Sequence, residues 1–524
     1  MNNKIIIGML SLLMITSLTS CLGDLDTEPL SKQIINGNNV FDTEEGYKQF
    51  LAKLYAGLTL TGQQGEFGDP EIDNPDEGET SFLRTYWSVQ ELTTDEALSS
   101  WNDPKINSLY EQNWGDQNAL ISLLYQRIYV NIAFCNEYLR AVDERIDGLS
   151  GGFQQEVITY RAEAATLRAL YYYFALDLWG NVPFILEEDG VGAYQPQQIS
   201  RADLFTFIET ELLEALPDLV DAGQNEYARV DKGMAWTLLA KMYLNAGVYT
   251  GQTQYDKAVE YSKLVIESGA YSLVDTYSDL FRADNHGLRQ EIIFPVAEDG
   301  VNTRNYGGMT FLIHGATGDG PANGVSGGWY GHRPTTAFVE NEFADAKDTR
   351  AYFTSNGQTT TTINNPVEFG QGYKCTKFQN VTASDAPGQD LTFVDTDFPM
   401  FRLADVYLMY AEAVLRGGAG GSAEQALIYV NDLRARAYGD VSGNISAAQL
   451  TLDFILSERG RELYWEAHRR TDLIRFEQFT SGDLRWDWKG GVQAGAATPD
   501  YLELLPIPSF DLGLNQNLKQ NDGY

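Results

Sequence analysis

Cys21 is the residue whose neighbours most clearly specify a chemistry. Lys4 precedes an apolar run over residues 5–18, and Leu18-Thr19-Ser20 leads directly into Cys21. A Leu-x-small-Cys sequence at the end of such a run is typical of a bacterial lipoprotein signal, in which the cysteine carries lipid and becomes the first mature residue. The alternative is an ordinary secretory signal with an incidental cysteine. We predict a signal peptide over residues 1–20 and lipidation at Cys21.

The other cysteines and the histidines show no spacing that specifies a reaction. Cys135 and Cys375 lie far apart and outside any Cys-x-x-Cys pair, so they form either one disulfide or two buried thiols. The histidines stand singly, without metal-ligand or triad spacing; they are His286, His314, His332 and His468. The sequence therefore predicts neither a zinc cluster nor a catalytic triad.

The charge and hydropathy of the chain limit its partners. A formal net charge of −36 repels phosphate backbones, and no dense Lys/Arg stripe offers a local exception. Nucleic acid is therefore excluded as a partner. After the signal peptide, no apolar run is long enough to cross a bilayer. We expect a protein that is anchored to a membrane rather than embedded in it.

The elements that must position any site are predicted to be helices. Apolar residues spaced three and four apart predict helices over residues 44–58, 119–142, 152–178, 201–219 and 231–247. Residues 233–249 and 255–268 form one helical hairpin, and 402–416 and 423–437 form another. Small residues on these faces, such as Ala240 and Ala426, allow close approach, as in tetratricopeptide-type repeats. Two unrelated hairpins are the alternative interpretation.

The chain between these hairpins has a different composition. Over residues 291–398 helical periodicity disappears, and Gly, Thr, Asn and aromatic residues dominate. Long irregular stretches in a compact protein are usually functional surfaces. The predicted organisation is a signal peptide (1–20), a lipidated tether (21–40) and a single helical domain (41–524) with a loop-rich, ligand-binding insertion at about 291–398. The predicted fold class is mainly α, with tetratricopeptide-type hairpins as the scaffold.

Four motifs in the last part of the chain resemble the RagB/SusD family of surface lipoproteins from Bacteroidetes. They are Arg402-Leu403-Ala404-Asp405, Glu458-Arg459-Gly460-Arg461-Glu462-Leu463, Arg469-Arg470-Thr471-Asp472-Leu473, and the end from Pro506-Ile507-Pro508 to Asn521-Asp522-Gly523-Tyr524. Further segments resemble the starch-binding branch of that family: Asp76-Glu77-Gly78-Glu79, Glu91-Leu92-Thr93-Thr94-Asp95-Glu96-Ala97, Tyr249-Thr250-Gly251-Gln252-Thr253, Thr303-Arg304-Asn305-Tyr306-Gly307-Gly308 and Trp486-Asp487-Trp488-Lys489-Gly490-Gly491. The resemblance extends over essentially the whole mature chain.

This resemblance implies a SusD-like α-helical fold and a role without catalysis. Family members capture a ligand and act as the lid and partner of a SusC-like, TonB-dependent outer-membrane transporter. The acidic residues Asp24, Asp26 and Glu28 after Cys21 resemble the export signal of surface lipoproteins in this family. We therefore expect a lipid anchor in the outer membrane at the cell surface, with starch or malto-oligosaccharides captured and delivered to the transporter.

The resemblance also implies which residues contact the glycan. Trp101, Tyr306 and Trp329 match an aromatic arc that follows a curved α-glucan, and Asp76 and Arg84 match polar residues that contact sugar hydroxyls. Asn102 matches a further amide contact, although the chain is one residue shorter after Trp101, so Pro104 competes for that position. Trp101 follows an apparent helix end at Ser99-Ser100, and the other two rings lie in Gly-rich loops, where large aromatic side chains are often presented to solvent.

A calcium ion is an option that the resemblance adds. Asp284, Gln290 and Asp487 match positions near a metal in the starch-binding relative, and hard cations prefer such oxygen ligands. A purely structural role for Trp486-Asp487-Trp488 is the alternative, and no cofactor is required for binding.

Two other functions remain open from the sequence. One is a SusD-like binder of a different glycan or of a peptide. The other is a surface glycoside hydrolase, which needs two carboxylates at a defined separation. Nothing in the sequence singles out such a pair, so we predict that the protein is not an enzyme.

Overall fold

The computed structural model describes residues 40–62, 70–190, 192, 194–318 and 320–524. The predicted signal peptide, Cys21 and the tether up to residue 39 lie outside the described residues. The described residues fall into two units, one that ends at Phe50 and one that begins at Leu51. In the first unit, a 3₁₀ turn (η1, Val40–Asp42) precedes the start of α2 (Glu44–Thr59), and Phe41 packs edge-on against Tyr47 with ring centroids 5.0 Å apart.

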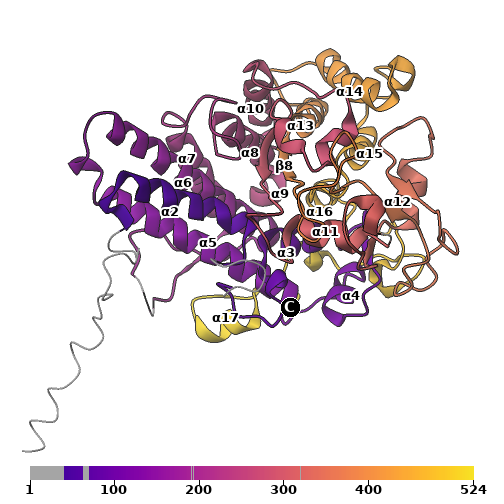
Figure 1. The fold of residues 1–524 in the computed structure, drawn as a ribbon, viewed down its shortest axis with the longest axis horizontal. Coiled ribbons are helices and arrows are strands. Elements are labelled where there is room, and N and C mark those ends of the chain that lie inside the picture. Colours follow the sequence, from indigo (N-terminus) through magenta and orange to yellow (C-terminus); the bar gives the residue numbers. More distant parts are fainter. Residues whose placement is uncertain (1–39, 63–69, 191, 193, 319) are drawn as a thin grey trace, which may run out of the picture. The chain divides into compact units, whose positions relative to one another are not determined.

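Helices make up most of the regular structure in the second unit, which confirms the mainly α prediction (Figure 1). They are α3 (Phe82–Glu91), α4 (Pro104–Tyr110), α5 (Ala119–Asp143), α6 (Gly151–Leu178), α7 (Arg201–Ala215), α8 (Lys232–Leu244), α9 (Ala246–Thr250), α10 (Tyr255–Glu267), α11 (Gly308–Ala316), α12 (Thr336–Glu342), α13 (Leu403–Leu415), α14 (Ala423–Tyr438), α15 (Leu452–Leu463), α16 (Arg469–Arg475) and α17 (Ser509–Leu514). The long helices begin and end within a few residues of the predicted positions.

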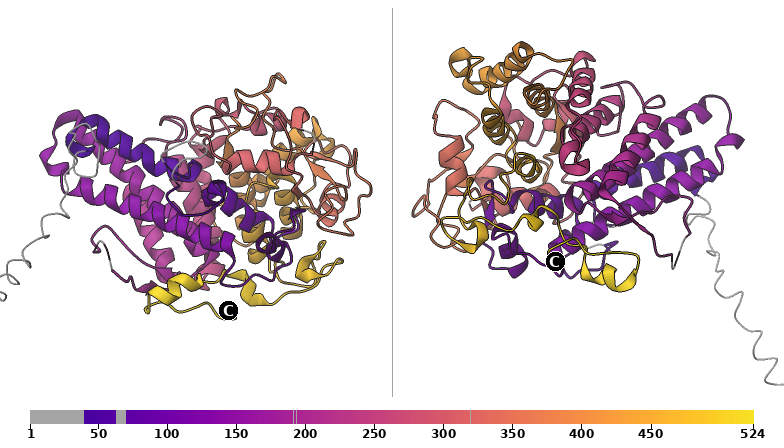
Figure 2. Two further views of the ribbon diagram at one scale, coloured as in Figure 1. Left: turned by 60° about the horizontal axis from the view of Figure 1, so that its bottom comes forward. Right: turned by 180° about the vertical axis from the view of Figure 1, so that it is seen from behind.

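The two predicted hairpins stack on one another. α8 packs on α10, α10 on α13, and α13 on α14, so the first hairpin meets the second through α10 and α13 (Figure 1). Ala240, Ala411 and Ala426 are fully buried in these helices. Small side chains let the helix backbones approach closely. The arrangement is the tetratricopeptide-type scaffold that the sequence predicts. α5, α6 and α7 extend it with a further layer, visible from both sides in Figure 2.

Local signals fix the ends of these helices. The side chain of Asp231 accepts a hydrogen bond from the backbone N–H of Met234, 3.0 Å away, at the start of α8. Ser422 caps α14 in the same way through Gln425, at 3.1 Å. Such caps satisfy backbone N–H groups that have no partner within the helix. Gly439, with φ of 71°, ends α14 in the left-handed conformation that glycine adopts without strain.

Short antiparallel strand pairs connect distant parts of the chain. β4 (Ile292–Val296) pairs with β8 (Phe398–Arg402), and the segment between them is the one predicted to be loop-rich. The other pairs are β1 (Leu98–Ser99) with β5 (His332–Arg333), β2 (Val182–Pro183) with β3 (Gln198–Ile199), and β6 (Phe353–Thr354) with β7 (Lys374–Cys375). The segment between β4 and β8 also holds α11 and α12. The sequence did not predict α11 because it is buried on every side and has no polar face.

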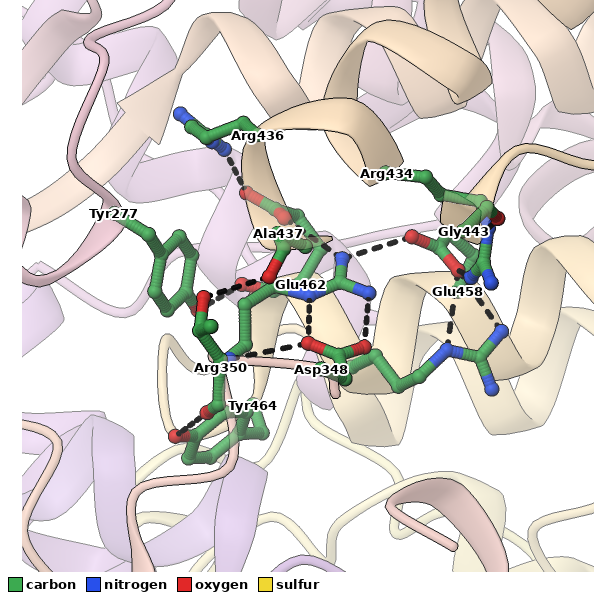
Figure 3. Close-up of polar contacts among 12 residues, drawn as sticks. Tyr277, Asp348, Arg350, Arg434, Arg436, Ala437, Gly443, Glu458, Glu462 and Tyr464 are labelled. Carbon is green, nitrogen blue, oxygen red and sulfur yellow. Dashed lines mark hydrogen bonds and ion pairs between the residues drawn. The ribbon is translucent and has the colours of Figure 1, made fainter. Parts of the chain in front are cut away.

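Paired charges fill much of the core around the C-terminal motifs. Arg350 contacts Asp348, Glu458 and Glu462, all with buried side chains (Figure 3). Arg402 contacts Glu291, Glu462 and Glu466 in the same way. Although burial raises the pKa of Glu462, the guanidinium groups of Arg436, Arg402 and Arg350 lower it to about 2. The motif Glu458–Leu463 that carries the family resemblance is therefore part of a buried charge network.

Both described cysteines are free thiols. Cys135 lies in α5 and Cys375 in β7, and both are buried. Burial raises the pKa of the Cys375 thiol to about 12. Of the two alternatives for this pair, the structure shows two buried thiols.

Candidate functional site

Trp101 lies in the loop between β1 and α4, and its ring is half-buried. The expectation that a helix ends at Ser99-Ser100 is wrong. α3 already ends at Glu91, and Ser99 pairs with His332 in the β1–β5 ladder. The next residue, Ser100, continues this pairing, because its backbone N–H donates to the carbonyl of Gly331, 2.8 Å away. A strand rather than a helix end therefore presents Trp101.

The three predicted aromatic residues come together in space. The indole N–H of Trp101 donates to the backbone carbonyl of Trp329, 2.8 Å away. The rings of Trp329 and Tyr306 have centroids 6.5 Å apart, and their planes are tilted by 43°. All three side chains are half-buried. They form an open, bent aromatic surface built from two distant parts of the chain.

Two histidines that the sequence left without a role lie beneath this surface. The His314 ring stacks on Trp329, with centroids 4.8 Å apart and planes tilted by 22°. The His332 ring meets Trp101 edge-on, at 4.7 Å, and also contacts Phe311 at 4.7 Å. Burial, together with the Arg84 guanidinium, lowers the pKa of His332 to about 3. His332 is therefore a neutral ring that supports Trp101 from below.

Glycines allow this close packing. A Cβ atom on Gly331 would lie 2.5 Å from the Trp101 ring, and one on Gly78 would lie 2.5 Å from the backbone of Tyr306. Atoms do not approach this closely without a shift of their neighbours. Gly331 thus allows the Trp101 ring to lie directly against its backbone, and Gly78 allows the backbone of Tyr306 to do the same.

Asp76 and Arg84 also lie beside the aromatic surface. Arg84, in α3, donates to the carboxylate of Asp76 at 3.0 Å and to that of Glu79 at 3.3 Å. Its other terminal nitrogen donates to the backbone carbonyl of Tyr306, 3.4 Å away. Arg84 is largely buried, whereas half of the Asp76 side chain is exposed. The carboxylate can therefore accept hydrogen bonds from a ligand while Arg84 holds it beside Tyr306.

Asn102 follows Trp101 and is exposed in the same loop. Its competitor, Pro104, is the first residue of α4, and Asp103 caps that helix by accepting from the N–H of Lys105, 3.1 Å away. A proline at this helical position replaces an N–H that would have no partner. Pro104 therefore has a structural role, and Asn102 is the one of the two with a polar side chain to offer.

The sequence reasoning missed three further neighbours. Tyr330, next to Trp329, is 54% exposed. Lys105 contacts Glu79 at 2.6 Å and so connects α4 to the Arg84 cluster. Phe311 lies under both Trp101 and the guanidinium of Arg84, 4.7 Å from the latter. The Trp329-Tyr330 pair between glycines was a signal for Tyr330, but Phe311 belongs to a helix that had no sequence signal.

The residues proposed to contact calcium have separate protein partners. Asp284 accepts from the backbone N–H of Ala383 at 2.9 Å, and Asp487 accepts from that of Ala337 at 3.2 Å. The side chain of Gln290 is exposed, and its backbone carbonyl accepts from the N–H of Ser272. Across the described ranges, no three His, Cys, Asp or Glu side chains are grouped so that they could hold a metal ion. A calcium-binding role for Asp284, Gln290 and Asp487 stays a prediction.

Known proteins are similar to this chain in sequence. Residues 328–524 match a family described as the SusD family, and residues 73–244 match one described as starch-binding and associating with the outer membrane. The starch-binding protein SusD of Bacteroides thetaiotaomicron is 35% identical, over 97% of this chain and 96% of that protein. The chain belongs to the SusD family. The resemblance of its motifs to RagB/SusD proteins is confirmed.

Solved structures of SusD proteins have the same fold. A SusD homolog from Bacteroides thetaiotaomicron superposes with a TM-score of 0.73 at 19% identity, covering 96% of this chain and 100% of that one. A laminarin-binding SusD-like protein superposes with a TM-score of 0.69 at 21% identity, covering 92% and 99%. The helical scaffold is therefore that of the SusD family. Within the described part of the chain, none of the helices combines the length and the hydropathy that a membrane span requires.

Proposed function

We propose that this protein is a non-catalytic, cell-surface lipoprotein that captures starch and malto-oligosaccharides. The supporting observation is the bent aromatic surface formed by Trp101, Tyr306 and Trp329. A pyranose ring presents a flat face of C–H groups that packs on an aromatic ring. Because the planes of Tyr306 and Trp329 are tilted by 43°, successive sugars must turn to follow them. An α-glucan turns in this way, whereas a β-linked chain such as cellulose is straight.

Polar groups beside the rings complete the proposed site. Asp76 and the exposed amide of Asn102 offer hydrogen bonds to the sugar hydroxyls, and Arg84 orients Asp76. A small number of placed polar groups is typical of a specific ligand site. They fix the register of the glucan on the aromatic surface.

The proposed function includes a location at the outer membrane and a transporter as partner. Lipid on Cys21 would anchor the chain at the outer face of the outer membrane, and a SusC-like, TonB-dependent transporter would receive the captured glucan. The relative named SusD and the SusD family match support this context. A Cys21→Ala variant should leave the membrane fraction, and the wild-type chain should co-purify with a large β-barrel protein in mild detergent. Consistent isolation alone would contradict the transporter role.

Two measurements, affinity electrophoresis and an assay for reducing sugar, distinguish a binding protein from an enzyme. In affinity electrophoresis, amylopectin should retard the wild-type chain, and replacement of Trp101, Tyr306 and Trp329 by Ala should remove the retardation. Tyr194→Ala is the matched control, because this tyrosine is also exposed, at 42%, but is not part of the aromatic surface. Release of reducing sugar from amylose by the pure protein would overturn the non-catalytic role. Retention by laminarin or cellulose instead of amylopectin would indicate a different glycan.

A further inference from the structure

A cavity lies between α5 and α17, and its lining does not include Trp101, Tyr306 or Trp329. It has a volume of about 500 Å³, within the range of about 300–1,000 Å³ that is usual for small-molecule sites. Figures 1 and 2 show α17 beside the first turns of α5. The wall residues that matter most are Asp73, Tyr125, Tyr129, Phe510 and Asp511. None of the residues proposed to bind glucan above is among those that line the cavity.

Three aromatic residues, Tyr125, Tyr129 and Phe510, are among those that line this cavity. The Tyr125 hydroxyl donates to Asp511 at 2.6 Å, and the Tyr129 hydroxyl donates to the carbonyl of Pro183 at 2.7 Å. Tyr125 is only 3% exposed and supports the wall from behind, whereas Tyr129 is half-buried and offers its ring, since its hydroxyl already has a protein partner. Phe510 stands edge-on to Tyr125, with centroids 6.5 Å apart, and is 43% exposed. A large, exposed aromatic side chain at the mouth of a cavity is a platform for an apolar ligand face.

Hydrogen bonds at both ends of α17 fix the wall of the cavity that this helix forms. The backbone N–H of Ser509 donates to the carbonyl of Asp116 at 3.2 Å, at the start of the helix. After its end, the amide of Asn515 donates to the carbonyl of Pro196 at 2.9 Å. Together with the contact between Tyr125 and Asp511, these bonds fix Phe510 in place. A rigid wall lowers the entropic cost of binding.

The polar groups of the cavity are mainly hydrogen-bond acceptors. Asp73 and Asp511 contribute carboxylates, and Glu71 is already paired with Arg127 at 2.5 Å. Among the described residues that line the cavity, none is Lys, Arg or His. An anionic ligand is therefore disfavoured, and a ligand rich in hydroxyl donors matches these acceptors. The apolar wall additionally requires a ligand with a flat face of C–H groups.

We infer that this cavity is a second saccharide site, which holds one or two neutral pyranose units. The choice of a saccharide as the ligand class rests on the proposed function. Two sites on one chain would bind two segments of the same polymer, and the second contact would then be intramolecular. The chain would then bind a long glucan more tightly than its affinity for a short oligosaccharide predicts.

The test uses the full chain in detergent and calorimetric titration with maltotriose, laminaritriose and cellotriose. With Trp101, Tyr306 and Trp329 all replaced by Ala, at least one trisaccharide should still bind with one site per chain. Adding Phe510→Ala should weaken this remaining binding at least tenfold. Ala133→Trp should do the same by filling the exposed mouth of the cavity, without removing any packed side chain. The control is Leu514→Ala, on the same helix and 69% exposed but not lining the cavity.

The possible results of these titrations distinguish the aromatic surface from the cavity as the place where sugar binds. If the triple variant binds none of the three sugars while the wild type does, the second site is overturned and the proposed function stands. If the triple substitution changes nothing but Phe510→Ala and Ala133→Trp remove binding, the proposed function fails and the second site stands. Binding of a trilysine peptide that is lost in Asp73→Asn, with no sugar bound by the triple variant, would identify a basic partner and overturn the saccharide site.

Discussion

The indole N–H of Trp101 donates to the backbone carbonyl of Trp329 across 228 positions of sequence, at 2.8 Å. The contact ties the orientation of one tryptophan to the backbone that carries the other. The two rings are therefore parts of one surface rather than independent side chains. A change that moves Trp101 should alter the platform as a whole.

Gly331→Ala is expected to disturb this platform without removing any aromatic ring. The new Cβ would lie 2.5 Å from the Trp101 indole, so the ring must shift. We expect affinity for maltoheptaose to fall on the order of tenfold, which equals about 1.4 kcal/mol. Gly327→Ala is the control in the same loop, because nothing lies within 4 Å of its added Cβ. Equal affinities for the two variants, measured by calorimetry, would contradict the proposed role of Trp101.

Arg84→Met should weaken glucan binding because it removes the group that orients Asp76. The fold should survive, since Asp76 is half exposed and Glu79 keeps its contact with Lys105. A loss of about 1–3 kcal/mol in binding free energy is typical when a charged hydrogen-bond partner is removed. Arg84→Lys should restore only part of the affinity, because an ammonium group cannot contact two carboxylates and the Tyr306 carbonyl with the geometry of a guanidinium fork. Full restoration by lysine would show that charge alone matters.

His332 should make the folded protein less stable as the pH falls. Its native pKa is about 3, whereas an unfolded histidine titrates at about 6.5. Between these values the unfolded chain binds a proton that the native chain does not, so stability decreases as the pH falls from about 6.5 to about 3. At pH 5 the effect is roughly 2 kcal/mol.

The matched variant for this prediction is His332→Leu, which cannot titrate. Urea unfolding at pH 7 and pH 5 should show a smaller loss of stability in the variant than in the wild-type chain. His314 and His468 also have lowered pKa values because of burial and remain in both proteins. Their contribution therefore cancels in the comparison. An identical pH dependence would mean that the pKa of His332 is the same in the native and the unfolded state.

Arg402→Met should destabilise the fold without altering the aromatic surface. It would leave Glu291, Glu462 and Glu466 without one of their cationic partners in the core. Removing one member of a buried ion pair costs about 3–5 kcal/mol. Arg161→Met, which breaks an exposed pair with Asp143, should cost at most about 1 kcal/mol. The free energies come from denaturant unfolding, and a smaller loss for Arg402→Met than for Arg161→Met would contradict the structural role of the network.

The sequence predicted the long helices well because their signals are local. Apolar spacing along residues 119–142 and 152–178 gave α5 and α6 almost to the residue, because this signal needs only residues within a turn or two of one another. The end expected at Ser99-Ser100 was wrong because the strand pairing of Ser99 with His332 depends on a partner more than 200 positions away. α11 was missed because a fully buried helix has no periodic pattern.

For the site, the sequence supplied the residue types and the motifs that place them in a family. It could not show that His314 and His332 support the aromatic rings, since single histidines carry no spacing signal. Nor could it show that the motif Glu458–Leu463 serves the buried charge network rather than a ligand.

By itself, the sequence determined the helical scaffold, the family and the aromatic residues proposed to bind sugar, because periodicity and motif are properties of neighbouring residues. Only the tertiary structure decided that Trp101, Tyr306 and Trp329 form one bent surface with Asp76 and Arg84 beside it. It also decided that a cavity lies between α5 and α17. Both depend on distances between segments hundreds of residues apart, and those distances are fixed by packing rather than by local sequence.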